Sequence, residues 1–449
     1  MISVRLFFLV IIVRYLQPVL NDICSNFKNE SLCQTYSEEK ELVCARELWN
    51  KYDKKVISTL SLCYWSEANF NPQILSDFPN LERFSLIKSS VKTIEKPFED
   101  RPALQMLNIS YNVIEQLLPL IFDKLQFLKV LDLRYNKLHQ LEASMLKILP
   151  NLQNVFLVGN QWYCEENFLW ITKQSNFADK IITDVDLLMC KGPKYNGKPL
   201  KQTMNMLETL NSQCSKMSDN CTCTLEHIVR VANNLRPMIT VNCSNQNLNS
   251  LPHILPKFTS TLVVRGNMIS SLDEFINNEN YFHLLNVYLD YNNISSINVL
   301  EGSSWLLSSF RALSLKGNKL TEVPIYVLEY AFEKNRNVAN LFLSENPWKC
   351  DCIFTPSFKD FLAKYRKIIK DVHDIKCAYR EGDENSLVSI SSLSRNKICY
   401  EDAIFKISFL KILNVCMTVL LAIILFDFTY NYYMYKKYSR LPWIVRKFS

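Results

Sequence analysis

The sequence predicts an α/β-type solenoid with two short leucine-rich-repeat arrays, each having a parallel concave sheet, an irregular convex side and disulfide caps, followed by one transmembrane helix. Three observations predict this fold. The spacing L-x-x-L-x-L-x-x-N-x-L recurs eight times, the cysteines fall in even groups beside the repeats, and one apolar segment lies near the carboxyl end. A chain of 449 residues with 48% hydrophobic composition is ample for more than one core.

The repeat spacing has a physical cause. Side chains alternate along the short L-x-L strand, so that two apolar residues point inward and the residue between them points outward. The Asn that follows can bond the backbone groups of the next turn, and Phe98 and Phe122 are placed to fill the layers behind the sheet. Single strings of this kind also arise in leucine-rich helices, but eight in register favour arrays at 81–160 and 253–346. Six strong copies begin at Leu104, Leu128, Leu152, Leu284, Phe310 and Val338, and weaker copies begin at Leu81 and Leu262.

The 15 cysteines indicate an oxidising compartment and divide the chain. Groups of four, six and four flank the repeats, and even counts are typical of a disulfide framework. They predict caps at 21–80, 161–213, 214–252 and 347–400, because a solenoid exposes its core at each end. No Cys or His completes a zinc-ligand pair beside the C-x-C runs, so we expect no metal. The pairing of Cys24, Cys33, Cys44 and Cys63 stays open.

Both ends of the chain indicate membrane targeting. An apolar run at 6–13 follows Arg5 and predicts a signal peptide at 1–20, although Arg14 interrupts it and no clear cleavage site precedes Cys24. The uncharged stretch 412–426 would span only about 22 Å, whereas a helix at 407–430 would span about 36 Å, enough for the ~30 Å hydrocarbon layer. A buried core helix is the alternative. Aromatic residues and then the basic tail 431–449 follow, which predicts a single-pass type I plasma-membrane protein with the repeats outside.

Composition and motifs exclude other classes. The tail 431–449 holds five basic and no acidic residues, so most of the net charge of +7 lies beside the apolar segment, and we exclude nucleic-acid binding. The seven glycines form no phosphate-binding motif, and the five histidines are scattered. We therefore expect neither catalysis nor a cofactor.

Two cap motifs resemble a known family. The run N-P-W-K-C-D-C at 346–352, with two later cysteines, resembles the carboxy-terminal cap of leucine-rich-repeat receptors. The runs C-T-C at 221–223, V-N-C-S at 241–244 and L-x-x-L-P at 248–252 resemble the matching amino-terminal cap. This order of caps in mid-chain is similar to that of insect Toll receptors. The resemblance covers about residues 81–430. It implies the pairs Cys350–Cys377, Cys352–Cys399, Cys214–Cys223, Cys221–Cys243 and Cys164–Cys190.

The chain departs from that family at two places. Glu166 stands where the first carboxy-terminal cap of the family carries a second cysteine. Both cysteines of that disulfide are therefore absent, which keeps the number of cysteines even. The alternative assigns Cys214 to that cap and leaves one cysteine unpaired. Toll receptors signal through a cytoplasmic TIR domain, but only 19 residues follow residue 430, fewer than the ~50 of a folded domain. We therefore expect no signalling domain in this chain.

The repeat register predicts which side chains face outward on the sheets. Three aromatic residues there, Phe156, Tyr288 and Phe342, are typical protein anchors, and Arg134 and Asp290 flank them. These five are the candidate ligand-face residues for an extracellular protein ligand or co-receptor. The alternative is that they cover the sheet and bind nothing. A homodimer is also left open.

Five N-x-[ST] sequons predict N-glycosylation. A glycan on Asn108 would block half of the first sheet face, because this residue projects outward between two core positions. The sequons begin at Asn29, Asn108, Asn220, Asn242 and Asn293.

Two functions remain from these observations. The first is a receptor-like surface protein that binds a protein and leaves signalling to that partner. The second is an adhesive or matrix-linking protein. Replacing the basic tail with neutral residues should abolish function only in the first case. The short tail and total size resemble in particular a developmental insect member of this group, which implies an indirect role in the ecdysone-induced response.

Overall fold

The computed structural model describes residue 24 and residues 33–36, 40–45, 49–172, 177–217 and 220–438. The predicted signal peptide, the sequon at Asn29 and residues 439–449 of the tail lie outside this part. The chain divides into two compact units, Met1–Ser218 with Cys223–Ile239, and Asp219–Thr222 with Thr240–Ser449. Each unit is described by itself.

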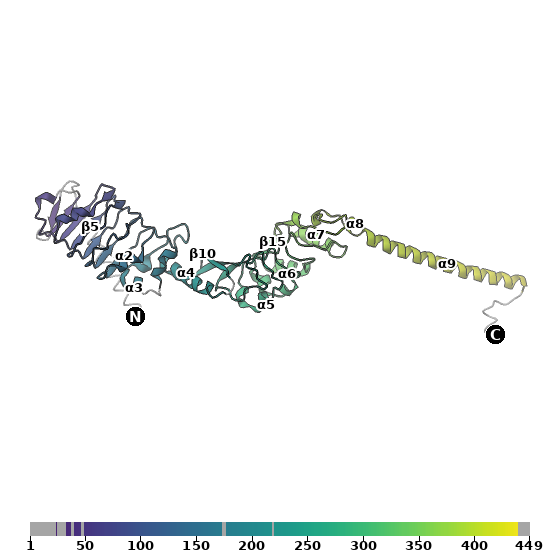
Figure 1. Cartoon of the computed structure of the whole chain (residues 1–449). Helices are drawn as coiled ribbons and strands as arrows, with labels where there is room; N and C mark the ends of the chain where they lie inside the picture. The colour runs from purple at the N-terminus through teal and green to yellow at the C-terminus, as the bar shows by residue number, and fades with distance from the viewer. Residues whose placement is uncertain are drawn as a thin grey trace. The chain divides into compact units, whose positions relative to one another are not determined.

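The first sheet has seven strands in the order β1-β2-β3-β5-β7-β8-β9, which lie side by side in Figure 1. Strands β1 and β2 are antiparallel, and every later pair is parallel. The bounds are β1 (Gln34–Tyr36), β2 (Glu41–Cys44), β3 (Thr59–Cys63), β5 (Arg83–Ile87), β7 (Met106–Asn108), β8 (Val130–Asp132) and β9 (Asn154–Phe156). A separate parallel pair joins β4 (Asn69–Phe70) to β6 (Thr93–Ile94).

This parallel ladder begins two strands before the first repeat that the spacing marks at Leu81. Strand β3 pairs with β5 so that Leu60 lies opposite Phe84. The spacing is preserved at Ile57, Leu60 and Leu62, but Trp65 stands where the Asn is expected. The amino-terminal cap therefore continues the sheet, and only its missing Asn conceals this in the sequence.

The second sheet has six strands in the order β10-β11-β12-β13-β14-β15. The strands from β12 to β15 are parallel and in register, so that Leu262, Val287, Leu313 and Leu341 form one buried column. The bounds are β10 (Thr222–Val231), β11 (Asn234–Asn242), β12 (Thr259–Val263), β13 (Asn286–Tyr288), β14 (Ala312–Ser314) and β15 (Asn340–Phe342).

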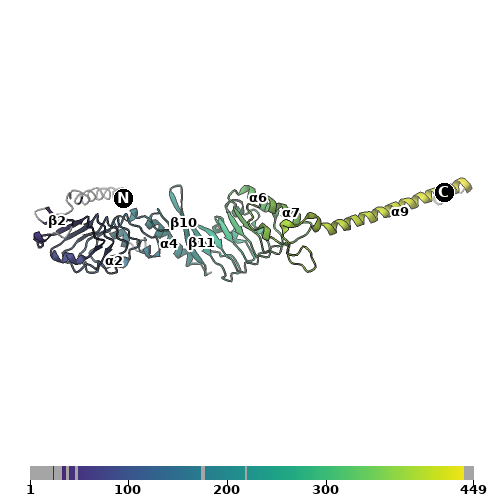
Figure 2. The same cartoon turned by 90° about the horizontal axis from the view of Figure 1, so that it is seen from above.

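The sides opposite the sheets consist of short helices, helical turns and loops. In the second unit, α6 and α7 lie side by side (Figure 2), and Phe332 stacks on Phe361 with ring centres 5.9 Å apart. In the first unit, Phe98 stacks on Phe122 at 6.1 Å, which fills two successive layers of the core. The bounds are η1 (Trp49–Lys51), η2 (Pro72–Asp77), α2 (Ala143–Lys147), η3 (Glu166–Ile171), α3 (Phe177–Ile181), η5 (Val185–Leu187), α4 (Leu200–Cys214), α5 (Glu274–Asn277), η6 (Glu279–Tyr281), η7 (Asn298–Leu300), η8 (Trp305–Ser309), α6 (Ile325–Lys334), α7 (Thr355–Lys364), η9 (Val372–Asp374), η10 (Ile390–Ser392), α8 (Arg395–Ile398) and α9 (Tyr400–Tyr438).

The repeat asparagines join successive repeats. The Asn136 amide donates to the carbonyls of Ile109 in the preceding repeat at 2.8 Å and of Leu133 in its own at 3.2 Å. Its oxygen accepts the backbone N–H of Ile114. Each such Asn satisfies backbone groups that are buried away from water, where an unpaired group would cost about 1–3 kcal/mol. The predicted solenoid class is confirmed by this architecture.

Disulfides and hydrogen-bonded carboxylates close the arrays. The carboxylate of Asp184 accepts the backbone N–H of Val158 at 2.8 Å, and Asp371 accepts that of Ser344 at 2.7 Å. Both N–H groups follow the last strand of a parallel sheet, so each carboxylate replaces the next strand at an open edge. Seven disulfides join Cys24–Cys63, Cys33–Cys44, Cys164–Cys190, Cys214–Cys223, Cys221–Cys243, Cys350–Cys377 and Cys352–Cys399.

Helix α9 contains a segment long and apolar enough to cross a membrane. This segment, Phe409–Lys437, has 29 residues and would extend about 43 Å at 1.5 Å per residue. The helix continues beyond residue 430, where the sequence placed the end of the span, and Tyr432, Tyr433 and Tyr435 are exposed on this extension.

Candidate functional site

On the first sheet face, two of the candidate ligand-face residues lie in contact. The guanidinium carbon of Arg134 lies 4.9 Å from the ring centre of Phe156 on the next strand. The same guanidinium forms an ion pair with Asp132, at 2.5 Å between Nη2 and Oδ2. Phe156 is therefore half-buried rather than fully exposed, because the arginine covers its ring.

Charge and burial hold this cluster in place. Desolvation alone would lower the pKa of Arg134, but its hydrogen bonds to Asp132 and the charge of that carboxylate raise the pKa above its ordinary value. Burial raises the pKa of the neighbouring Asp184, against the opposing effects of the backbone N–H groups of Val158 and Leu157. The guanidinium thus stays charged over the whole physiological pH range.

The second sheet face carries the same three kinds of side chain in contact. Here the carboxylate follows the strand of the aromatic residue, whereas on the first face it lies on the strand that precedes the arginine. Arg265 lies over Tyr288, 4.8 Å from the ring centre, and its Nε lies 2.5 Å from Oδ2 of Asp290. Ser314 donates a hydrogen bond to the other oxygen of Asp290. Two of the candidate ligand-face residues, Tyr288 and Asp290, are therefore brought together by Arg265, which was not among the candidates. The candidate Phe342 is half-buried, with no cation over its ring among the described residues.

The outward position of Asn108, on the strand β7 beside the first cluster, is not open to solvent. Asn108 is only 1% exposed and its oxygen accepts the backbone N–H of Ser110, because neighbouring strands only ~4.8 Å apart leave little room between them. The side chains of Asn220, Asn242 and Asn293 are exposed. A glycan at Asn108 remains a prediction, and the folded array does not present its amide to solvent.

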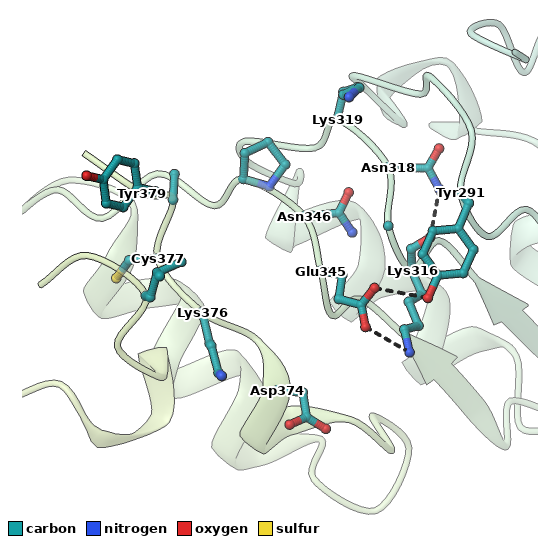
Figure 3. A pocket seen from close by; sticks show the side chains of 14 residues that line it. Tyr291, Lys316, Asn318, Lys319, Glu345, Asn346, Asp374, Lys376, Cys377 and Tyr379 are labelled. Atoms are coloured by element: carbon teal, nitrogen blue, oxygen red, sulfur yellow. Dashed lines mark hydrogen bonds and ion pairs between the residues drawn. The ribbon is translucent and has the colours of Figure 1, made fainter. Parts of the chain in front are cut away.

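A hollow that the sequence did not indicate lies at the rim of the second array, against its carboxy-terminal cap (Figure 3). Its volume is about 600 Å³. On one wall, Glu345 accepts a hydrogen bond from the hydroxyl of Tyr291 at 3.0 Å and pairs with Lys316 at 3.0 Å. The hydrogen bond to Lys316 lowers the pKa of Glu345, and the bond to Glu345 raises the pKa of Lys316.

The position that precedes each repeat Asn explains why Tyr291 can reach Glu345. Tyr291 and Glu345 each precede a repeat Asn and have φ of +55° and +57°, in the left-handed region. Gly317 holds the same position in the repeat between them, and the Tyr291 ring lies across it because glycine lacks a Cβ. The tyrosine therefore reaches over one repeat to the next. In the sequence, the residue before each repeat Asn marks the positions that form this wall.

Among the described residues, no His, Cys, Asp and Glu side chains gather into a group that could hold a metal ion. The repeated parallel sheets and the disulfide-bonded caps define a leucine-rich-repeat protein.

Comparison with known proteins narrows this class. A leucine rich repeat family model matches residues 102–161, and the Halfway C-terminal domain model matches residues 410–447. Protein singed wings 2 of Drosophila melanogaster is 35% identical over 392 residues, which cover 86% of this chain and 77% of that protein. The chain belongs to the family of singed wings 2.

Two further similarities accompany this match. Protein halfway of Drosophila melanogaster is 23% identical over 83% of this chain and 65% of its own length. A solved structure of the Toll–Spatzle complex has 20% identity and a TM-score of 0.36, and covers 77% of this chain and 52% of that chain.

Proposed function

We propose that this chain is a non-enzymatic cell-surface glycoprotein whose ectodomain binds a protein ligand or co-receptor through its two sheet faces. The observation that carries the proposal is that a guanidinium, an aromatic ring and a carboxylate form the same cluster on both faces. Aromatic and arginine side chains dominate the binding energy of protein interfaces. Because each arginine is already held by its carboxylate, binding costs less side-chain entropy.

The proposed location is the plasma membrane, with the repeats outside and α9 as a single type I span. Seven disulfides require an oxidising compartment for the ectodomain. Lys436 and Lys437 follow the aromatic end of the helix, as expected for the cytoplasmic side. A developmental role in the insect ecdysone-induced response, which the resemblance stated from the sequence implies, is part of this proposal.

The test is capture of surface partners by the full-length protein displayed on insect cells, by proximity labelling followed by measurement of affinity. The double variant Arg134→Ala with Arg265→Ala should weaken the captured interaction roughly tenfold or more, as is typical of hot-spot residues. Arg336→Ala is the matched control, because this exposed arginine lies between α6 and β15, away from the sheet face. Equal affinity of the wild type, the double variant and the Arg336→Ala control for the captured partner would refute the proposal that the sheet faces bind it.

A further inference from the structure

Helix α9 carries one side-chain amide inside the segment that is long and apolar enough to cross a membrane. Asn414 lies in the uncharged stretch 412–426, and its side chain is exposed. The two threonines of the segment bond their own helix, because the hydroxyls of Thr418 and Thr429 each donate to a carbonyl of the preceding turn, at 2.8 Å and 2.9 Å. Among the described residues, no group bonds the amide of Asn414.

The carboxylate of Asp427 determines how deep this amide would lie. A charged side chain is costly inside the hydrocarbon layer, so Asp427 belongs at or beyond its boundary. At about 1.5 Å per residue, Asn414 lies about 20 Å along the helix from Asp427. In a layer ~30 Å thick, the amide is then about 10 Å inside the opposite boundary, where no water can bond it. Lys411 lies one turn nearer that boundary, and its long stem can carry the ammonium to the headgroups.

The amide lies on a side of α9 that can pack against another helix. Intervals of four and three residues lead from Asn414 to Thr418 and Leu421, which share one side of a helix with about 3.6 residues per turn. This alternation is the spacing by which two helices pack along a common seam. Asp427 and Cys416 lie about 140° and about 160° away around the helix axis, on the other side. The side of Asn414 therefore offers one polar group among apolar ones.

We propose that α9 pairs in the membrane with α9 of a second copy of this chain, parallel and in register, through the side that carries Asn414. Each Asn414 amide donates to the amide oxygen of the other copy, because a carboxamide has both a donor and an acceptor. A second copy presents this group at the same depth, whereas a helix of different sequence presents it there only by coincidence. The same pairing keeps both Asp427 carboxylates out of the contact. The proposal rests on the proposed function only in taking α9 as a membrane span, and its contact is separate from the sheet faces.

The first experiment measures energy transfer between full-length copies that carry a donor or an acceptor fluorescent protein at the carboxyl end, in insect-cell membranes over a range of expression densities. Asn414→Leu should raise the density needed for half-maximal transfer roughly tenfold, or about 1.4 kcal/mol, as expected for hydrogen bonds between membrane helices. Asn414→Gln keeps the amide and should retain most of the transfer. Asn431→Leu is the matched control, because this asparagine of the same helix lies beyond Asp427 and about 100° from the proposed contact.

The second experiment tests the side of the helix by cysteine cross-linking of the full-length protein. In a Cys416→Ala background, Leu421→Cys should form an intermolecular disulfide when the membranes are treated with copper phenanthroline. Leu420→Cys is the control, because it lies at nearly the same depth but about 120° away from Asn414 around the axis. The Leu421→Cys protein should therefore run as a dimer on a non-reducing gel, and the Leu420→Cys protein as a monomer.

Several results would overturn the proposal. Energy transfer unchanged by Asn414→Leu, or equal cross-linking of the two cysteine variants, would each do so. Pairing only with a different, co-expressed membrane protein would assign this side of α9 to that partner instead of to a second copy. Carbonate extraction of the membranes separates the two proposals: a chain that is released refutes the membrane span itself, whereas a retained chain that does not pair refutes only the pairing. Surface display equal to that of the wild type verifies that the variants fold.

Discussion

Replacing Gly317 with alanine should destabilise the second unit by more than the conformational cost of a left-handed alanine. At φ of +67°, an alanine pays about 1–2 kcal/mol. A Cβ there would also lie 2.6 Å from Cε1 of Tyr291, so that the ring must move and release its hydrogen bond to Glu345. Overpacking of this kind costs about 1–3 kcal/mol, which brings the expected total to about 2–5 kcal/mol.

Gly302 supplies the matched control. Its φ is +76°, but nothing lies within 4 Å of an added Cβ, so Gly302→Ala should cost only the backbone term of about 1–2 kcal/mol. The assay is thermal unfolding of the full chain, in which each kcal/mol lowers the midpoint of a unit of this size by about 2–4 °C. In a Tyr291→Ala background, Gly317→Ala should cost no more than Gly302→Ala. Equal midpoints for the two alanine variants, or no rescue by removal of Tyr291, would refute the reasoning.

Three further predictions concern the core, glycosylation and pH. Leu131→Ala, at a fully buried position of the first sheet, should cost about 2–5 kcal/mol in chemical unfolding, and a cost below 1 kcal/mol would contradict the stacked register. Asn293→Gln should increase the gel mobility of the full-length protein from insect cells by the mass of one glycan, whereas Asn108→Gln should not. A mobility shift for Asn108→Gln would show that this residue is glycosylated before the array folds. Because the pKa of Glu345 is lowered and that of Lys316 is raised, their mutual stabilisation should be constant at neutral pH and be lost as pH falls through the folded pKa of Glu345 or rises through that of Lys316. The difference in unfolding midpoint between wild type and Glu345→Gln should therefore shrink on acidification from pH 7, and a growing difference would exclude this sign.

The repeat period predicted the core because burial in a strand depends on local alternation. Leu107, Leu131 and Val155 lie in one buried column of adjacent strands, as the L-x-L spacing requires. The earlier strand β3 escaped prediction because Trp65 replaces the Asn that marks each turn. A repeat could therefore be recognised where the leucine spacing was followed by a polar residue at the Asn position, and it was missed where Trp65 occupies that position.

The solvent exposure of the outward side chains was predicted less well, because the alternation along a strand gives the direction of a side chain and not how much of it neighbouring residues cover. The alternation that places Asp132 and Asn108 on the sheet face is correct, but both side chains are 1% exposed. Arg134 forms an ion pair with Asp132 and lies over the ring of Phe156, which comes from the next strand. Exposure on a sheet face depends on residues more than twenty positions away, which no local pattern includes.

The sequence by itself determined the repeats, the even groups of cysteines and the apolar segment near the carboxyl end, because each depends on spacing along the chain. Only the tertiary structure decided that Arg265 covers Tyr288, and that Tyr291, Glu345 and Lys376 border one hollow. Stacking brings residues from separate repeats within a few ångströms, and side-chain size and the left-handed turns then determine which of them meet.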